Sequence, residues 1–263
     1  LVTTVHGFYS VNRYSKIMTA GERVICVSNS VREYVLKHYP DVPEHKLRVI
    51  HRGVDPADLP FGYQPPAEWL EQWYREFPQT KGKYLVTLPG RITRWKGHLD
   101  FVKVIADLSE RGLPVHGLFV GEAHPRKLEF FEEVKKAVSD AQLQHRITFV
   151  GHRKDVRDVL GISDVVVSCS TDPEAFGRVT LEALALGKPV AAYAHGAVAE
   201  QLEAFLPEGK MRVGDTQGIA DCLGAWFKQP PTPRRSERFS RQAMLESTLA
   251  EYQALAVGGT PAA

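Results

Sequence analysis

The sequence predicts an α/β fold in which parallel sheets are covered by helices on both faces. Short apolar runs alternate with amphipathic helical patterns along nearly the whole chain of 263 residues. Most of these runs lack polar alternation, which is typical of parallel strands that are buried on both faces. Strands and helices in alternation indicate right-handed βαβ units and a doubly wound sheet.

Eight segments are expected to form strands, because each is a short apolar run. They are residues 2–5, 23–27, 47–50, 84–88, 115–120, 147–150, 165–168 and 189–193. Between the strands, apolar residues recur at helical spacing. One such stripe comprises Phe101, Val102, Ile105 and Leu108, and another comprises Leu128, Phe131, Val134 and Val138.

Two proline-rich breaks interrupt this alternation, at residues 55–83 and 230–235. The first break contains a helix with an aromatic stripe made of Trp69, Leu70, Trp73, Tyr74 and Phe77. Packing in the core or between domains is the favoured explanation of that stripe. A surface that faces an acceptor or a membrane is the alternative.

Composition excludes several classes of protein. Hydrophobic residues make up 43% and charged residues 24%, which is an ordinary globular balance, and the formal net charge of +2 gives no argument for nucleic acid binding. No apolar run approaches the ~20 residues of a membrane-spanning helix. Cys26, Cys169 and Cys222 lack the spacing of a zinc site or disulfide framework, so we expect no metal and a reducing, cytoplasmic location.

Familiar catalytic motifs are missing from the sequence. There is no G-x-G-x-x-G after a strand, no G-x-S-x-G, no H-E-x-x-H and no Asp-x-Asp pair. Gly187 and Lys188 resemble the end of a P-loop, but Glu182 occupies the position of that motif's first glycine. Dehydrogenases, P-loop kinases, α/β hydrolases and zincins therefore lose their main sequence support.

A first candidate cluster, residues 88–97, lies between a predicted strand and a predicted helix. Ligands bind at such carboxyl ends of strands in doubly wound sheets. Gly90 allows a turn and close approach of a ligand, while Arg91 and Lys96 offer positive charge to a diphosphate. A solvated loop with incidental charges is an equally good interpretation of this cluster alone.

A second candidate cluster, residues 172–183, follows the strand predicted at residues 165–168. Glu174 is expected just before a helix, and Glu182 one to two turns inside it. Gly177 leaves the N–H groups at the helix start open toward a phosphate. The spacing of the two carboxylates is weak evidence for a binding site by itself. The position of the cluster after a buried strand strengthens that evidence.

Both clusters resemble motifs of one family. The run from Glu174 to Val190 resembles the E-x7-E signature of retaining glycosyltransferases with the GT-B fold, and residues 90–97 resemble their G-R-x-x-x-x-K-G element. Matches in the same order include Val5-His6-Gly7, residues 52–55, residues 150–156 and residues 195–200. The resemblance covers residues 5–202 and is strongest to bacterial enzymes that build lipopolysaccharide core and related envelope glycans.

The resemblance implies roles for individual residues. Glu174, Arg91, Lys96 and His6 would be catalytic, with Arg91 and Lys96 offsetting charge on the leaving diphosphate. Glu182 would bind ribose hydroxyls. The residues implied to bind the donor are Gly90, Arg91, Lys96, His152, Arg153, Glu174, Phe176, Gly177, Arg178 and Glu182. Two departures stand out, because Arg52 replaces the usual Asn and Arg178 replaces a common Leu.

The resemblance also implies two Rossmann-like domains. Residues 1–60 would be a partial amino-terminal, acceptor-side domain, since the chain starts on an interior strand. Residues 61–235 would be the donor domain, and residues 236–263 a helix that crosses back to the first domain. No cofactor would be required beyond a nucleoside-diphosphate sugar, with a UDP-sugar favoured.

The expected reaction is transfer of a sugar to an acceptor hydroxyl with retention of anomeric configuration. The implied partners are a nucleotide-sugar donor and a glycan or glycolipid acceptor, without nucleic acid. Peripheral contact with the inner face of the membrane is an open alternative. Two rival functions are a nucleotide-sugar epimerase on the same fold and a non-catalytic nucleotide-binding fragment.

Overall fold

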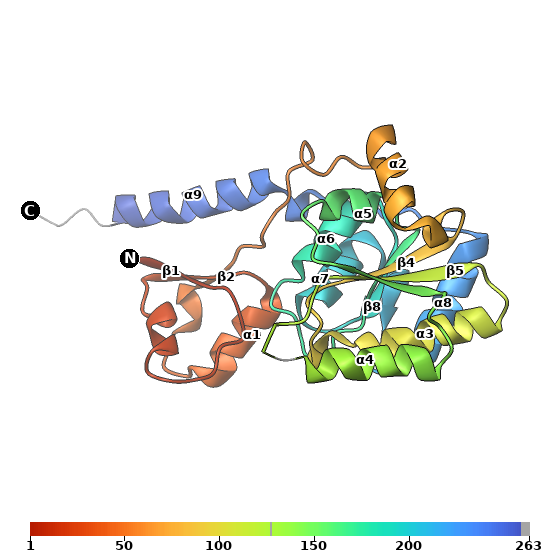
Figure 1. Cartoon of the computed structure of the whole chain (residues 1–263). Helices are drawn as coiled ribbons and strands as arrows, with labels where there is room; N and C mark the ends of the chain where they lie inside the picture. The colour runs from red at the N-terminus through yellow and green to blue at the C-terminus, as the bar shows by residue number, and fades with distance from the viewer. Residues whose placement is uncertain (127, 259–263) are drawn as a thin grey trace, which may run out of the picture.

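Two parallel sheets organise the chain, and a computed structural model describes them over residues 1–126 and 128–258. The smaller sheet has the order β1-β2-β3, where β1 is Val2–Val5, β2 is Arg23–Cys26 and β3 is Leu47–Val49. The larger sheet has six strands in the order β6-β5-β4-β7-β8-β9. Figure 1 shows the smaller sheet beside the long helix α9, apart from the larger sheet.

The strand order of the larger sheet determines where a ligand can bind. Its strands are β4 (Tyr84–Pro89), β5 (Val115–Val120), β6 (Ile147–Gly151), β7 (Val165–Ser168), β8 (Val190–Tyr193) and β9 (Lys210–Met211). The chain leaves β4 in one direction for β5 and β6, and returns to the other side of β4 with β7. Such a reversal opens a crevice at the carboxyl ends of the two central strands.

Helices cover both faces of the larger sheet, as the alternating pattern predicts. The helices between the two ends of the chain are α2 (Ala67–Glu76), α3 (His98–Glu110), α4 (Glu129–Asp140), α5 (Val156–Ile162), α6 (Arg178–Ala185), α7 (Gly196–Phe205) and α8 (Thr216–Lys228). Two further helices, α1 (Asn29–His38) and α9 (Arg241–Gly258), accompany the smaller sheet (Figure 1). In Figure 1, α3 and α4 lie below the sheet, and α5 and α6 lie above it.

The eight expected strands all form, with ends that differ by at most one residue. Strand β9 was not expected, because its two residues do not form an apolar run. The stripe expected around Leu128 is wrong in part. Helix α4 begins only at Glu129 and buries Phe130, Val134 and Val138, so Leu128 is left 49% exposed.

The aromatic stripe of α2 packs into a core. Trp73 is 1% exposed, its ring stacks on Trp69 with a centroid distance of 5.2 Å, and it contacts Phe77 at 4.7 Å. The same cluster includes Leu85 from β4 and Leu118 from β5. This confirms the core-packing interpretation of the stripe over an acceptor- or membrane-facing surface.

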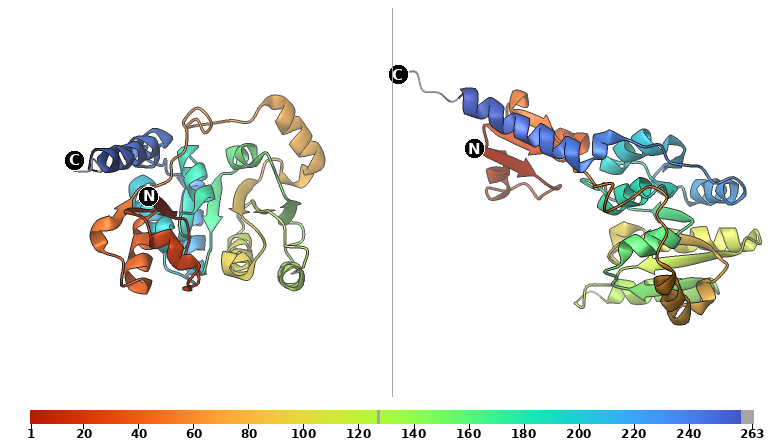
Figure 2. Two further views of the ribbon diagram at one scale, coloured as in Figure 1. Left: turned by 90° about the vertical axis from the view of Figure 1, so that its left-hand side faces the viewer. Right: turned by 90° about the horizontal axis from the view of Figure 1, so that it is seen from above.

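Helix α9 lies along the smaller sheet, far in sequence from the strands that it contacts (Figure 2). Glu251 accepts hydrogen bonds from Arg23 Nε at 3.1 Å and Arg48 Nε at 2.9 Å. Just before α9, the backbone N–H of Val54 donates to the Phe239 carbonyl at 2.9 Å. The domain boundaries given above stay predictions.

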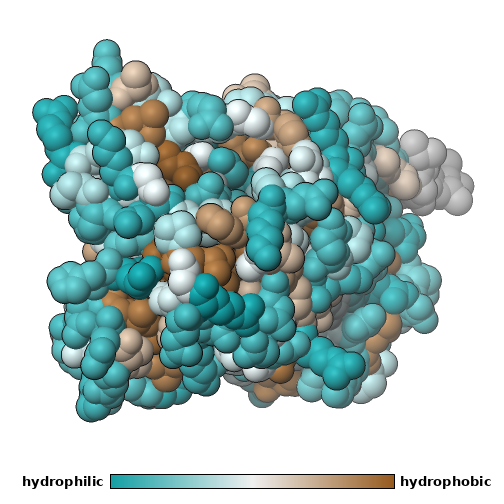
Figure 3. All heavy atoms as spheres, turned by 90° about the vertical axis from the view of Figure 1, so that its right-hand side faces the viewer, coloured by the Kyte–Doolittle hydropathy of each residue, from teal (hydrophilic) through white to brown (hydrophobic). Residues whose placement is uncertain are grey.

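The side of the larger sheet that faces away from α9 is mostly hydrophilic, with hydrophobic side chains gathered in short separate stretches (Figure 3). In the part of the chain that the structure describes, no helix is both long and apolar enough to span a membrane.

Candidate functional site

The loops that follow β4 and β7 lie side by side at the reversal point of the larger sheet. The N–H of Thr171 donates to the Trp95 carbonyl at 2.7 Å, which ties the two loops together. Gly97 has φ +71°, and a Cβ on it would overlap the carbonyl oxygen of Cys169. Only glycine fits such a close approach with a positive φ. The two clusters identified in the sequence therefore form one surface.

An ion pair joins the two clusters. Lys96 Nζ donates to Glu174 Oε1 at 2.8 Å, and the two side chains are only 17% and 16% exposed. The hydroxyl of Ser170 donates to the same oxygen at 2.7 Å. Lys96 also lies 4.3 Å from the centroid of the Trp95 ring. A fixed ammonium group and a fixed carboxylate are thus held together at the carboxyl ends of β4 and β7.

The loop before α6 is held by its carbonyl groups. The carbonyls of Glu174, Ala175 and Phe176 accept hydrogen bonds from the Ala197 N–H, the Ser28 hydroxyl and the Gln201 amide, respectively. Gly177, with φ +72°, then leads into the helix. Within residues 1–126 and 128–258, no acceptor bonds the N–H groups of residues 176–178. These donors, at the positive end of α6, are suited to binding an anion.

Glu182 lies one turn inside α6, as the sequence predicts. Its Oε1 accepts from Arg178 Nε at 2.7 Å. The Arg178 side chain is 79% exposed, whereas that of Glu182 is 17% exposed. The carboxylate is therefore the better-fixed member of the pair.

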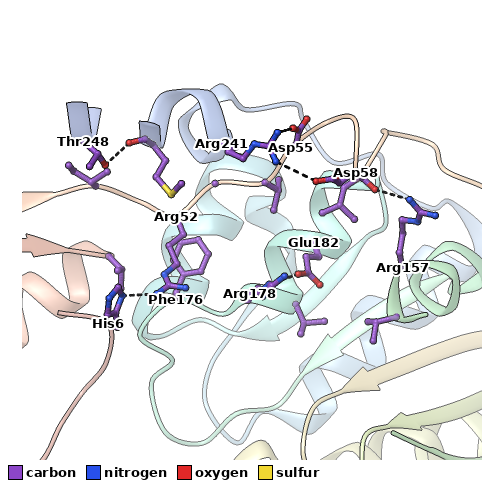
Figure 4. Close-up of a pocket in the computed structure, with 18 of the residues that line it drawn as sticks. His6, Arg52, Asp55, Asp58, Arg157, Phe176, Arg178, Glu182, Arg241 and Thr248 are labelled. Atoms are coloured by element: carbon purple, nitrogen blue, oxygen red, sulfur yellow. Dashed lines mark hydrogen bonds and ion pairs between the residues drawn. The ribbon is translucent and has the colours of Figure 1, made fainter. Parts of the chain in front are cut away.

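A cavity of about 1120 Å³ lies between the smaller sheet, α6 and α9 (Figure 4). Four of the predicted site residues line it, namely His6, Phe176, Arg178 and Glu182. The other seven do not line it, namely Gly90, Arg91, Lys96, His152, Arg153, Glu174 and Gly177. Within the described ranges, no group of three or more His, Cys, Asp and Glu side chains is placed to hold a metal ion.

The side chains of the loop after β6 do not join the cluster formed by the loops after β4 and β7. His152 is exposed, and the Arg153 side chain bonds Asp155 at 2.6 Å and Glu76 at 3.3 Å. Arg153 also lies 5.6 Å from the Trp73 ring centroid. Because the Arg153 side chain is engaged in these contacts, the backbone groups of residues 152–154 are the ones predicted to contact the donor. Arg91 is exposed on the loop after β4.

His6 lies on the opposite wall of the cavity from α6, at the end of β1. Its Nδ1 is 2.6 Å from Nη2 of Arg52, and Figure 4 shows the two side chains pointing toward each other. Burial lowers the pKa of His6, and the neighbouring charge of Arg52 lowers it further. Sequence reasoning noted Arg52 only as a departure from a motif, and its contact with His6 was not predicted.

Other supporting residues were also missed. Ser170 and Gln201 orient the loop around Glu174, and Glu200 accepts hydrogen bonds from Asn29, Ser30 and His51 across the two regions. The segment around Glu200 was recognised as part of the family resemblance, but nothing in a single sequence shows that its carboxylate faces the amino end of α1.

Comparison with known proteins places this geometry in a family. A model described as glycosyl transferases group 1 matches residues 71–243, and one described as Glycosyltransferase Family 4 matches residues 1–58. The lipopolysaccharide core biosynthesis mannosyltransferase LpsB of Rhizobium meliloti (strain 1021) is 30% identical over 230 residues, with 82% of this chain and 62% of that protein covered. An alpha-maltose-1-phosphate synthase of Mycolicibacterium smegmatis is 28% identical, with 74% of this chain and 50% of that protein covered.

Solved structures show the same fold. A glycosyltransferase from Rickettsia africae ESF-5 is 27% identical with a TM-score of 0.81, over 97% of this chain and 70% of that one. Anabaena Alr3699/HepE, solved in complex with UDP, has a TM-score of 0.82 at 21% identity, over 97% of this chain and 72% of that one. The fold is GT-B, with Rossmann-like parallel sheets. Because the group 1 model matches well over half of its residues, the chain belongs to the glycosyl transferases group 1 family.

Proposed function

We propose that the protein transfers a sugar from a nucleoside-diphosphate sugar to an acceptor hydroxyl with retention of anomeric configuration. One observation supports this most strongly. The ammonium group of Lys96, the carboxylate of Glu174 and the unbonded N–H groups before α6 lie together where β4 and β7 end. A diphosphate linked to a sugar needs positive charge, N–H donors and a hydroxyl acceptor within a few ångströms of one another.

The donor's phosphates are assigned to the loops after β4 and β7. Lys96 and Arg91 stabilise the charge that develops on the departing diphosphate, and Gly90 allows the diphosphate to approach the backbone. The N–H groups of residues 176–178 bind the distal phosphate and the sugar. No metal ion is needed in this scheme, since lysine, arginine and N–H groups carry the electrostatic stabilisation.

The rest of the donor is assigned to carboxylates and one loop. Glu174 accepts hydrogen bonds from hydroxyls of the donor sugar, and Glu182 accepts from the ribose. The backbone of residues 152–154 faces the base. This division follows the positions of the two carboxylates, because Glu174 lies before α6 and Glu182 lies one turn inside it.

Chemistry then proceeds on one face of the sugar. The bond between the anomeric carbon and the phosphate oxygen breaks, and the acceptor oxygen bonds the same face of that carbon. The acceptor's proton passes to the leaving phosphate oxygen, so no side chain serves as a nucleophile. His6 contacts the donor sugar near the reacting carbon from the smaller sheet.

A role in bacterial envelope glycan synthesis, such as lipopolysaccharide, is part of the proposal. LpsB supports it, as a relative that is named for lipopolysaccharide core biosynthesis. The chain spans 62% and 50% of the two relatives' lengths, so the activity, the donor and the acceptor of the whole protein are all proposals. UDP-sugars are the first donors to test, and the proposed location is cytoplasmic, with peripheral contact at the inner membrane.

A transfer assay tests the proposal against its rivals. The protein is incubated with UDP-, GDP- and ADP-sugars, with and without a lipopolysaccharide-core acceptor, and nucleotide release and product linkage are followed. We expect acceptor-dependent release and an α-linked product from an α-linked donor. A changed sugar configuration without acceptor indicates an epimerase, and binding without release indicates a non-catalytic module. Glu174→Gln should lower the rate about 10²-fold, and Glu110→Gln, at an exposed position on α3, should not.

A further inference from the structure

The contact between Arg52 and His6 determines the protonation state of the histidine. A guanidinium group carries only N–H donors and stays charged at any physiological pH. The Nδ1 atom, 2.6 Å from Arg52 Nη2, must therefore be the acceptor in this hydrogen bond. A neutral imidazole with an unprotonated Nδ1 has its proton on Nε2. His6 is thus a hydrogen-bond donor through Nε2 toward any ligand that it contacts.

Arg52 is itself held on both sides along the chain. Its neighbour His51 contacts Glu200 of α7, with Nε2 2.8 Å from the carboxylate. Glu200 in turn accepts from the N–H groups of Asn29 and Ser30, at 3.2 Å and 3.1 Å, at the amino end of α1. On the other side of Arg52, a Cβ on Gly53 would overlap the backbone of Ser240. The Arg52 backbone therefore has little freedom to move away from His6.

Other charged side chains around the cavity are paired with one another and not with His6 or Arg52. Across the cavity, Arg178 is paired with Glu182 on α6, and Arg241 at the start of α9 is paired with Asp55 and Asp58. Among the described residues, none of these groups bonds His6. Protonation of Nδ1 would place two cations in contact, which disfavours the imidazolium form.

We propose that Arg52 is a positioning residue that keeps His6 neutral, with Nδ1 as acceptor and the Nε2 proton directed to the ligand. The consequence for the reaction rests on the proposed function: His6 donates a hydrogen bond to the donor sugar or the acceptor oxygen and does not remove a proton. Deprotonation of the acceptor is then left to the leaving phosphate.

The tautomer can be measured without any substrate. Nitrogen-15 NMR of ring-labelled histidine, assigned with the His6→Gln variant, reports the protonation of each ring nitrogen across a pH titration. We expect an unprotonated Nδ1 and a pKa below the ordinary value in the wild type. In Arg52→Ala the pKa should rise, and both tautomers should be populated. Arg48→Ala, which removes a positive charge from β3, should leave the His6 signals unchanged.

Two results overturn the inference. One is a wild-type His6 with its proton on Nδ1, and the other is an Arg52→Ala variant with the same tautomer and pKa as the wild type. Circular dichroism of each variant confirms that the fold is intact. Arg52→Asn provides a second substitution if the alanine variant does not fold, and it should show the same rise in pKa.

Activity gives an independent readout. A glutamine amide can donate in place of Nε2, so His6→Gln should keep transfer within about tenfold of wild type, whereas His6→Ala should lose more. Arg52→Ala should lower kcat/KM mainly above the pKa of His6, where part of the neutral imidazole carries its proton on Nδ1 instead of Nε2. If NMR finds the expected tautomer but no transfer occurs with any donor, only the proposed function fails. If transfer occurs and His6→Gln is no better than His6→Ala, the role of His6 as a donor fails.

Discussion

The two halves of the candidate site are held in place by different forces. In the larger sheet, the loops after β4 and β7 are held by close packing, where Gly97 lies against Cys169 and Gly177 against the Val198 side chain, in addition to the ion pair of Lys96 with Glu174. On the side of the smaller sheet, polar contacts join segments that are far apart in sequence: Arg52 contacts His6, and Glu200 of α7 contacts the neighbouring His51. Close packing around a glycine does not change with pH, whereas a hydrogen bond to a carboxylate weakens when the carboxylate is protonated.

The same contrast applies to exposure. Glu200 of α7 is 13% exposed and accepts hydrogen bonds from Asn29, Ser30 and His51 on the side of the smaller sheet, while the pair of Arg178 and Glu182 includes a largely exposed arginine. An ion pair at an exposed position of a helix stabilises by about 0.3–0.5 kcal/mol, but breaking a buried pair costs about 3–5 kcal/mol. Substitutions in the two regions should therefore differ both in size and in pH dependence.

The largest effect is expected at Gly97. Gly97→Ala should lower the free energy of unfolding by about 2–5 kcal/mol, because it combines a left-handed backbone with overlap on Cys169. Chemical denaturation measures this loss. Gly112→Ala is the matched control, since Gly112 also has a positive φ (+79°) but open space around it. Equal losses in the two variants would show that close packing does not hold the loops together.

A smaller, pH-dependent effect is expected at Glu200. Burial acts to raise its pKa, but hydrogen bonds from His51, Ser30 and Asn29 outweigh burial and lower the pKa to about 2. Because the folded-state pKa is below the ordinary value of 4.5, this stabilisation is complete above pH 4.5 and is lost as the pH falls toward 2. Glu200→Gln should cost about 2–3 kcal/mol at pH 7.

Denaturation between pH 2 and pH 7 checks this expectation. The loss of unfolding free energy caused by Glu200→Gln should shrink as the pH falls. Glu110→Gln, at an exposed position, should lower the free energy of unfolding at neither pH. An equal loss of unfolding free energy at pH 3 and pH 7 in Glu200→Gln would contradict the claim that hydrogen bonds to the Glu200 carboxylate hold the smaller sheet's side in place.

The smallest effect is expected at Arg178. Arg178→Ala should change the free energy of unfolding by no more than about 0.5 kcal/mol, because the side chain is 79% exposed and its partner lies only one turn away. Addition of 0.5 M salt should remove most of this difference. A loss above about 1.5 kcal/mol would mean that polar pairs matter as much near α6 as near Glu200.

The sequence predicts the larger sheet well because its strands are uniform apolar runs separated by clear helical stripes. It also places Lys96 and Glu174 correctly on loops after strands and Glu182 in the helix that follows, because all three belong to recognisable motifs, and their roles in binding and catalysis stay predictions. Two-residue β9 carries no periodic signal and cannot be predicted in this way. The contacts of Arg52 with His6 and of Glu200 with α1 depend on how distant segments meet, which local pattern does not contain.

Isothermal titration calorimetry of UDP and of uridine tests the central assignment most directly. The assignment is that Lys96, at the carboxyl end of β4, binds the diphosphate of the donor. Lys96→Ala should weaken UDP binding by about 10- to 100-fold, equivalent to about 1.5–3 kcal/mol for a lost charge-assisted hydrogen bond, and leave uridine binding unchanged. Lys103→Ala, at an exposed position of α3, should change neither. Equal losses for UDP and uridine in Lys96→Ala, or no loss for UDP, would contradict the assignment.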